Sequence, residues 1–225
     1  MPRRRAKRKR VSKTWYQVYA DDIFPGQWIG ETPANDPESL IGRNVEVVLR
    51  DITGDFMHEK YKLWFRIYKV DGIKAYARFE KEMLNRDYLR SIVQRRSSRI
   101  DVMTDSRTRD GHDVRVFTII ITAVRIRNSQ KHAIRMRVDN LLKQVIPELT
   151  LEDLVKSYLF NEPRPIIDEI KRVSTKIAPI KYVELRKLLL MKRGEGEEVP
   201  EAILGNEEEE IIEGSAAGGG GGEEA

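Results

Sequence analysis

The sequence contains no cysteine in its 225 residues, which excludes disulfides, thiolate nucleophiles, cysteine-bound zinc and iron–sulfur clusters. No apolar run approaches the roughly 20 residues that a membrane-spanning helix requires. The charged N-terminus is not followed by an apolar stretch, so we expect neither a secretory signal nor a membrane partner. The hydrophobic fraction of 40% is nevertheless large enough for a buried core, which excludes a wholly disordered chain.

Residues suited to catalysis are also scarce. None of the three histidines, His58, His112 and His132, has metal-ligand spacing. The sequence shows no nucleophile elbow, catalytic triad or phosphate-binding loop. Asp51 and Asp55 flank Gly54, which is most simply a turn, because aspartate and glycine supply turn geometry. We therefore expect no catalytic residue, no metal and no cofactor; a metal-dependent nuclease that uses Asp51 and Asp55 is the enzyme alternative.

Charge is abundant, and it is sorted by position. All 41 lysines and arginines lie at or before Arg193, whereas residues 194–225 hold 11 of the 36 acids. Residues 1–193 therefore contain 41 cations and the remaining 25 acids, which is a net charge of +16. The net charge of the whole chain is only +5. Such an excess repels itself unless a polyanion neutralises it, so nucleic acid is the predicted partner.

The N-terminal segment concentrates this positive charge. Residues 2–13 contain no acid and eight cations: Arg3, Arg4, Arg5, Lys7, Arg8, Lys9, Arg10 and Lys13. If about six to eight cations contact phosphates, affinity should fall about 10³–10⁵-fold between about 50 and 200 mM salt, because binding releases condensed counterions. A nuclear localisation signal or a disordered solubilising tail is the alternative interpretation.

Composition divides the chain into three parts. Residues 1–14 form a basic arm, residues 15–193 a single folded domain, and residues 194–225 an acidic, glycine-rich tail. The tail contains the runs Glu207–Glu210 and Gly218–Gly222, and neither composition can bury a core.

The first half of the domain shows strand patterns. Apolar residues alternate with polar ones over 45–49 and again over 61–70, where Tyr61, Leu63, Phe65 and Ile67 share one face. The turn residues Asp71-Gly72 follow, so the chain is expected to return as a strand over 74–79 and to form a hairpin.

A helix and two further strands are expected next. Residues 84–96 have helical spacing, and residues 100–104 and 114–127 have strand patterns around the turn residues Asp110-Gly111. The run Ile119, Ile120 and Ile121 is apolar on both faces, so the middle of the second strand should be buried on both sides.

The second half of the domain is mostly helical. Apolar stripes predict helices over 134–146 and 166–177, and Thr150 with Asp153 three residues later predicts a capped helix start. The periodicity of residues 181–192 fits a strand or a helix. Strands followed by helices predict the α+β class.

Cations outside the arm form three groups. Arg95, Arg96 and Arg99 follow the predicted 84–96 helix, where they could simply complement the helix dipole. Lys62 and Arg66 alternate with Trp64 and Tyr68 on the outer face of the 61–70 strand, an arrangement that suits stacked bases. Packing of those two aromatic rings beneath a helix is the favoured interpretation of this face.

The third group runs from a predicted strand end into the next helix. No acid interrupts its five cations, which are Arg125, Arg127, Lys131, Arg135 and Arg137. A solvated surface is the alternative, but we predict that this group, the other two groups and the arm bind RNA through phosphate contacts.

A series of short segments follows a familiar order along the chain. They are WY at 15–16 with Phe24, IGR at 41–43 leading into VEV at 45–47, YLRSIV at 88–93, RIDV at 99–102, DG at 110–111, VRVF at 114–117, IRMR at 134–137, IAPI at 177–180 and VELRK at 183–187. Taken together over nearly all of residues 11–193, the series resembles the archaeal and eukaryotic small-subunit ribosomal protein family eS1, also called S3Ae, in an archaeal-type form.

The resemblance implies both a fold and a function. The fold would be a β-barrel-like core of mainly antiparallel strands flanked by helices, with residues 181–192 as a strand. The protein would be a structural, non-catalytic rRNA-binding component of the small-subunit platform, near the rRNA 3′ end and the mRNA exit, and ribosome-bound in the cytoplasm. Its partners would be small-subunit rRNA, neighbouring platform proteins and mRNA. A free nucleic-acid-binding protein, such as a chromatin or translational regulator, is the alternative.

Overall fold

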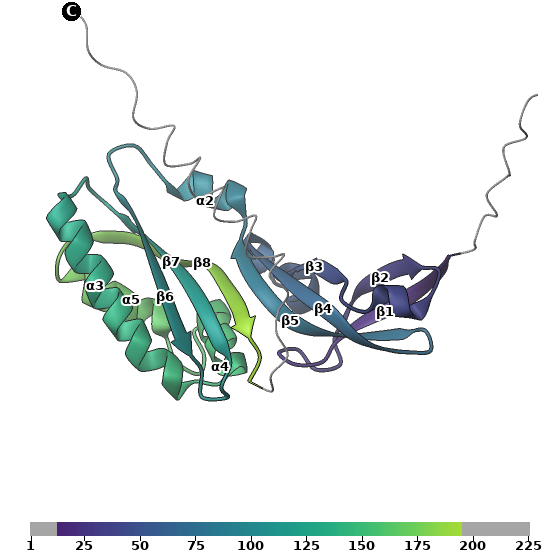
Figure 1. Cartoon of the computed structure of the whole chain (residues 1–225). Coiled ribbons are helices and arrows are strands. Elements are labelled where there is room, and N and C mark those ends of the chain that lie inside the picture. The colour runs from purple at the N-terminus through teal and green to yellow at the C-terminus, as the bar shows by residue number, and fades with distance from the viewer. Residues whose placement is uncertain (1–12, 195–225) are drawn as a thin grey trace, which may run out of the picture.

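The computed structural model describes residues 13–194, which form one eight-stranded mixed sheet with helices packed on it (Figure 1). The strands are β1 (Thr14–Ala20), β2 (Trp28–Ala34), β3 (Asn44–Val48), β4 (Tyr61–Asp71), β5 (Lys74–Leu84), β6 (Arg99–Arg107), β7 (Asp113–Thr122) and β8 (Ile180–Lys192). The helices are α1 (Leu49–Thr53), α2 (Arg86–Ile92), α3 (Asn128–Val145), α4 (Leu151–Phe160) and α5 (Ile166–Thr175), with short 3-10 turns η1 (Pro37–Leu40), η2 (Phe56–Lys60) and η3 (Ile146–Glu148). The predicted α+β class of mainly antiparallel strands flanked by helices is confirmed, although the sheet of the described residues is not closed into a barrel.

Strand β5 connects the two parts of the sheet. One edge of β5 pairs antiparallel with β4. Its other edge pairs in parallel with β1 through Lys74–Ala77 and antiparallel with β8 through Lys81–Met83. The N-terminal part of the sheet is therefore β2-β1-β5-β4-β3, and the C-terminal part continues from β5 as β8-β7-β6.

The predicted hairpin is β4–β5. Tyr61, Leu63, Phe65 and Ile67 are all buried, as their alternation indicated. The turn contains Gly72 at φ +59°, a left-handed conformation that glycine adopts without steric penalty. The apolar face of this hairpin is one part of the N-terminal core, which β1, β2 and β3 complete.

Strand β7 lies in the core on both faces, as predicted. Ile120 belongs to the main core, together with Ile134 and Val138 of α3. Ile119 and Ile121 point the other way and form a second cluster with Ile92 of α2. Figure 1 shows α3, α4 and α5 gathered beside β6–β8.

Several predicted boundaries were wrong. The helix expected over 134–146 begins at Asn128, and the strand expected over 74–79 continues to Leu84. The helix expected over 84–96 is α2, Arg86–Ile92, because Leu84 still pairs with Tyr61 in the β4–β5 ladder. The Asn85 side chain then caps α2 by accepting a hydrogen bond from the Asp87 amide at 3.2 Å. The strand expected over 114–127 ends at Thr122. Arg125 and Arg127 therefore lie in the loop between β7 and α3.

The ambiguous segment 181–192 is strand β8, as the family resemblance implied. Its ladder with β7 has register shifts between Phe117 and Thr118 and between Ile121 and Thr122. Such bulges interrupt the alternation of inward and outward side chains. The sequence of β8 therefore shows no clean period of two.

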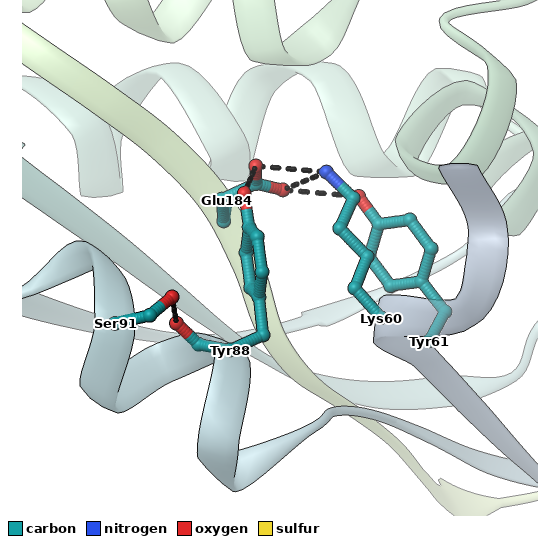
Figure 2. Close-up of polar contacts among 5 residues, drawn as sticks. All are labelled: Lys60, Tyr61, Tyr88, Ser91 and Glu184. Carbon is teal, nitrogen blue, oxygen red and sulfur yellow. Dashed lines mark hydrogen bonds and ion pairs between the residues drawn. The ribbon is translucent and has the colours of Figure 1, made fainter. Parts of the chain in front are cut away.

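A buried ionic cluster joins β4, α2 and β8 (Figure 2). The Glu184 carboxylate on β8 accepts hydrogen bonds from Lys60 Nζ at 2.9 Å, Tyr61 Oη at 3.0 Å and Tyr88 Oη at 3.0 Å. Burial, and then the charge of Glu184, raises the pKa of Tyr61 and of Tyr88, so both hydroxyls remain protonated donors at neutral pH. The cluster therefore fixes the N-terminal part of the sheet against β8.

Glu82 on β5 is a second buried carboxyl with different surroundings. Its side chain is fully buried, and neither carboxyl oxygen has a hydrogen-bond partner among residues 13–194. Burial, and then the charge of Glu184, raises the pKa of Glu82 well above its usual value of 4.5. Glu82 therefore favours the neutral, protonated form in the folded state.

Replacing Glu82 with glutamine is expected to raise the free energy of unfolding by about 2 kcal/mol near pH 8, because glutamine carries no charge to bury. A raised folded-state pKa stabilises the fold at low pH, and this stabilisation is lost as pH rises from about 4.5 through the folded-state pKa. Wild-type stability should therefore decline over that range, and the decline should be much flatter in Glu82→Gln. Urea unfolding of both proteins from about pH 5 to 9 measures how the free energy of unfolding depends on pH. Glu152→Gln, an exposed glutamate paired with Lys156, is the control and should change stability by less than about 0.5 kcal/mol. An unchanged pH slope in Glu82→Gln would contradict the assignment.

Candidate nucleic-acid interface

Three chain segments without acidic residues meet at one end of the C-terminal part of the sheet. Residues 91–100, 122–138 and 171–183 contain no aspartate or glutamate. The Thr122 amide donates to the Ser98 carbonyl at 3.0 Å, and the Ile126 amide donates to Ser98 Oγ at 3.1 Å. The Ala123 amide donates to the Pro179 carbonyl at 2.9 Å, which brings in the third segment.

We call this surface the basic end. It lies where β6 and β8 begin and where β7 ends. Its cations are Arg95, Arg96, Arg99, Arg125, Arg127, Lys131, Arg135, Lys176 and Lys181. All but the half-buried Lys131 are exposed. The structure thus joins two cation groups that lie about 30 positions apart in sequence.

Few carboxylates neutralise the basic end. Asp101 forms an ion pair with Arg99 at 3.0 Å. Within residues 13–194, no ion pair involves Arg95, Arg96, Arg125 or Arg127. These guanidinium groups therefore present their charge and their donors to solvent, and guanidinium geometry matches phosphate oxygens.

Helix α3 adds to the positive potential at this surface. Its N-terminus lies next to Arg127, and the aligned peptide dipoles of an 18-residue helix place a partial positive charge there. Arg135 Nε donates to the Asp101 carbonyl at 3.2 Å and so holds α3 along β6. The basic end is consequently built on regular elements rather than on a single long loop.

Three of the predicted cations outside the arm do not lie at the basic end. Arg137 is exposed on α3, but two residues of helix place it about 200° around the axis from Arg135. Lys62 Nζ bonds the Glu46 carboxylate at 2.7 Å, and an Arg66 guanidinium nitrogen lies 3.5 Å from a Glu80 oxygen. Carboxylates of neighbouring strands thus compensate Lys62 and Arg66.

The two aromatic residues that alternate with Lys62 and Arg66, Trp64 and Tyr68, have different environments. Trp64 lines a pocket of about 470 Å³ together with Arg86 and Arg90 of α2, and Lys81 Nζ lies 5.0 Å from its ring centroid. Tyr68 is instead contacted from neighbouring segments of the sheet: Arg78 lies 4.0 Å from its ring centroid, and its hydroxyl donates to Asp21.

The basic arm joins the fold at the other end of the molecule. Residues 3–10 lie outside the described residues, and Lys13 is exposed directly before β1. Figure 1 shows β1 and β2 at one end and α3 at the other. The start of β1 and the basic end therefore lie at opposite ends of the described structure (Figure 1).

The residues considered for catalysis have structural contacts. The Asp55 side chain accepts from the Met57 amide at 2.9 Å and caps η2, while Asp51 lies 3.7 Å from Arg50. His112 Nδ1 accepts from the Gly194 amide at 2.9 Å. In the described part of the chain, no three histidine, cysteine or acidic residues gather where they could hold a metal. Nor does this part contain a helix long and apolar enough to span a membrane.

Lys176 and Lys181 were missed by sequence reasoning. The signal for them was the acid-free segment 171–183, which looked like an ordinary helix end followed by an ambiguous stretch. Lys181 Nζ donates to Gln94 Oε1 at 2.6 Å, which ties the beginning of β8 to the turn that carries Arg95 and Arg96.

Comparison with known proteins by a family model and by individual relatives identifies the same family. The model of the Ribosomal S3Ae family matches residues 2–194. The small ribosomal subunit protein eS1 of Methanopyrus kandleri is 38% identical over 192 residues, which cover 85% of this chain and 91% of the relative. The proteins of the same name from Desulfurococcus amylolyticus and Methanocaldococcus jannaschii are 44% identical over 186 residues and 38% identical over 197 residues. These alignments cover 82% and 86% of this chain and 86% and 87% of the relatives.

Proposed function

Since this chain belongs to the ribosomal S3Ae family, we propose that it is a structural component of the small ribosomal subunit that binds rRNA through its basic end and its arm. The observation that carries the RNA contact is the convergence of the three acid-free segments at one surface. Exposed arginines without carboxylate partners are suited to phosphate oxygens. The basic end would therefore position the protein on folded RNA by shape and charge rather than by base sequence.

The family resemblance supports a proposed location within the subunit. The protein would lie on the platform near the rRNA 3′ end and the mRNA exit, on ribosomes of the cytoplasm, with other platform proteins and mRNA as neighbours. Residues 1–14 would act as a basic arm, residues 15–193 as one rRNA-binding domain, and residues 194–225 as an acidic tail. The arm would contribute its eight cations to contacts with rRNA phosphates.

Sedimentation tests the proposal against a free nucleic-acid-binding protein. A tagged chain in a cell lysate of low salt is expected in the small-subunit fractions of a sucrose gradient. Its absence from those fractions would favour the free binding protein. RNA cleavage that depends on a divalent metal and disappears in Asp55→Ala would instead support the nuclease alternative.

The combined variant Arg125→Ala/Arg127→Ala/Lys181→Ala is expected to weaken binding to a small-subunit rRNA fragment about 10- to 100-fold at roughly 100 mM salt. The slope of log affinity against log salt should decrease by about three, one for each phosphate contact. Fluorescence anisotropy at several salt concentrations measures both quantities. The matched control Lys62→Ala/Arg66→Ala/Lys156→Ala removes three cations that have carboxylate partners, so its effect should be smaller. Equal losses in the two variants would show that only net charge matters.

A further inference from the structure

A row of aromatic side chains crosses the solvent face of the N-terminal part of the sheet. Tyr76 on β5 is paired in register with Tyr19 on β1, and Tyr19 is paired with Trp28 on β2. Directly paired residues of neighbouring strands project from the same face of a sheet. Five of the six chain neighbours of these residues are buried on the opposite face, namely Val18, Ala20, Ile29, Ala75 and Ala77. The three rings therefore stand next to one another on the outside.

Trp15 extends the row along β1. Trp15 lies four residues before Tyr19 on β1, so it shares this face about 13 Å away along the strand. Trp15 and Trp28 expose 60% and 52% of their surface. Isolated exposed apolar residues are ordinary, but aromatic rings that line up over three adjacent strands form a continuous surface.

Cations lie between the rings. Lys74 Nζ is 5.6 Å from the Tyr19 ring centroid, and the Arg78 guanidinium is 4.0 Å from that of Tyr68 on the adjoining strand β4. The basic arm enters the sheet directly before Trp15. Aromatic faces interleaved with cations are how proteins bind single-stranded nucleic acid, because bases stack on the rings while phosphates meet the cations.

Three acids lie at the margin of the row, and one of them, Asp71, is paired with Lys74 in the β4–β5 ladder. Asp21 accepts the Tyr68 hydroxyl, and Glu31 is exposed next to Gln17 on the neighbouring strand. They lower the attraction for the dense phosphates of a duplex, whose bases are in any case not free to stack on a protein surface. Stacking of unpaired bases is then the main attraction at this surface.

We propose that Trp15, Tyr19, Trp28 and Tyr76 form a stacking platform for an unpaired RNA segment. This inference rests on the proposed ribosomal function and adds a second type of RNA contact to it. The basic end holds folded rRNA through phosphates, whereas the platform holds exposed bases and Lys74 lies beside it for the phosphates of the same strand.

Intrinsic tryptophan fluorescence tests the platform directly. The titrant is a single-stranded oligoadenylate of about ten nucleotides, added to the full-length protein at salt concentrations from about 0.1 to 0.5 M. Binding is expected to quench the fluorescence because a base stacks on Trp28. Trp28→Ala should weaken binding about tenfold, and the combined variant Tyr19→Ala/Trp28→Ala/Tyr76→Ala should weaken it at least 100-fold, as measured by anisotropy of a labelled oligonucleotide.

The salt dependence separates stacking from charge. The platform variants should shift the plot of log affinity against log salt downward without changing its slope, since they remove no cation. Phe56→Ala removes a 72%-exposed aromatic ring on η2 and is the matched control, with affinity unchanged. Tyr19→Phe/Tyr76→Phe keeps the rings and should also bind as the wild type does. Thermal unfolding verifies that each variant is folded.

The outcomes for the platform and for the proposed function differ. If the platform variants bind oligoadenylate as tightly as the wild type at every salt concentration, the platform proposal is overturned, and a protein partner becomes the better explanation of this face. If the variants lose oligoadenylate binding but the wild type does not sediment with small subunits, the platform stands and the ribosomal function fails.

Discussion

Deletion of residues 1–13 is expected to weaken binding to small-subunit rRNA about 1,000-fold at roughly 100 mM salt and to leave the melting temperature nearly unchanged. The eight cations of this segment have no acid among them. If each neutralises one phosphate, the slope of log affinity against log salt should decrease by about seven. Stability should be preserved because the segment contains no apolar pattern that could pack on the core.

Filter binding over a range of salt concentrations, combined with thermal unfolding of the same samples, measures these effects. A chain of full length in which the eight cations are replaced by serine is the matched control for the length of the arm, and it should behave like the deletion. Removal of residues 195–225 tests whether loss of negative charge affects RNA binding. It should not weaken binding, because all charged residues of that segment are acids. A large loss of stability in the deletion would show that the arm is part of the fold.

Replacement of Glu184 with leucine is expected to lower the free energy of unfolding by about 3–5 kcal/mol, the effect typical of removing one partner of a buried ion pair. The side chains of Lys60 and Glu184 are only 23% and 10% exposed. The substitution leaves the Lys60 ammonium and the hydroxyls of Tyr61 and Tyr88 without their acceptor, at the point where β4, α2 and β8 meet. Urea unfolding at neutral pH measures the loss.

Two further variants identify the cause of the loss. Glu184→Gln retains an acceptor for the hydroxyls and should lose less stability than Glu184→Leu. The double variant Lys60→Met/Glu184→Leu should recover part of the loss, because no unpaired ammonium remains. Since the charge of Glu184 contributes to the raised pKa of Glu82, Glu184→Leu should also flatten the decline of stability with pH. Equal stability of the single and double variants would show that the ammonium is not the source of the effect.

Local patterns predicted those elements whose boundaries are set by neighbouring residues. The β4–β5 hairpin needed only alternation and the turn at Gly72, and α4 needed only Thr150, whose hydroxyl accepts from the Asp153 amide at 3.1 Å. The 84–96 helix was predicted too long because the ladder between Leu84 and Tyr61 overrides helical spacing at its start. Strand β8 could not be predicted from periodicity, because its pairing with β7 contains bulges that interrupt the alternation of side chains.

The candidate site was predictable as a set of cations but not as a surface. Arg95 and Arg125 appeared in separate groups, and contacts of Ser98 bring those groups together. Lys62 looked equivalent to them, yet Glu46 on the paired strand compensates its charge. The aromatic platform was missed entirely, because Tyr19, Trp28 and Tyr76 come from three strands and none forms a pattern with another along the chain.

The sequence by itself determined the separation of charge, the arm, the class of fold and the polyanionic partner, because each of these depends on composition or on residues within a few positions of one another. Only the tertiary structure decided which cations share a surface, which are neutralised and which rings stand in a row. Those properties depend on strand register and on distances within about one Debye length, roughly 8–10 Å, between residues that can be many positions apart.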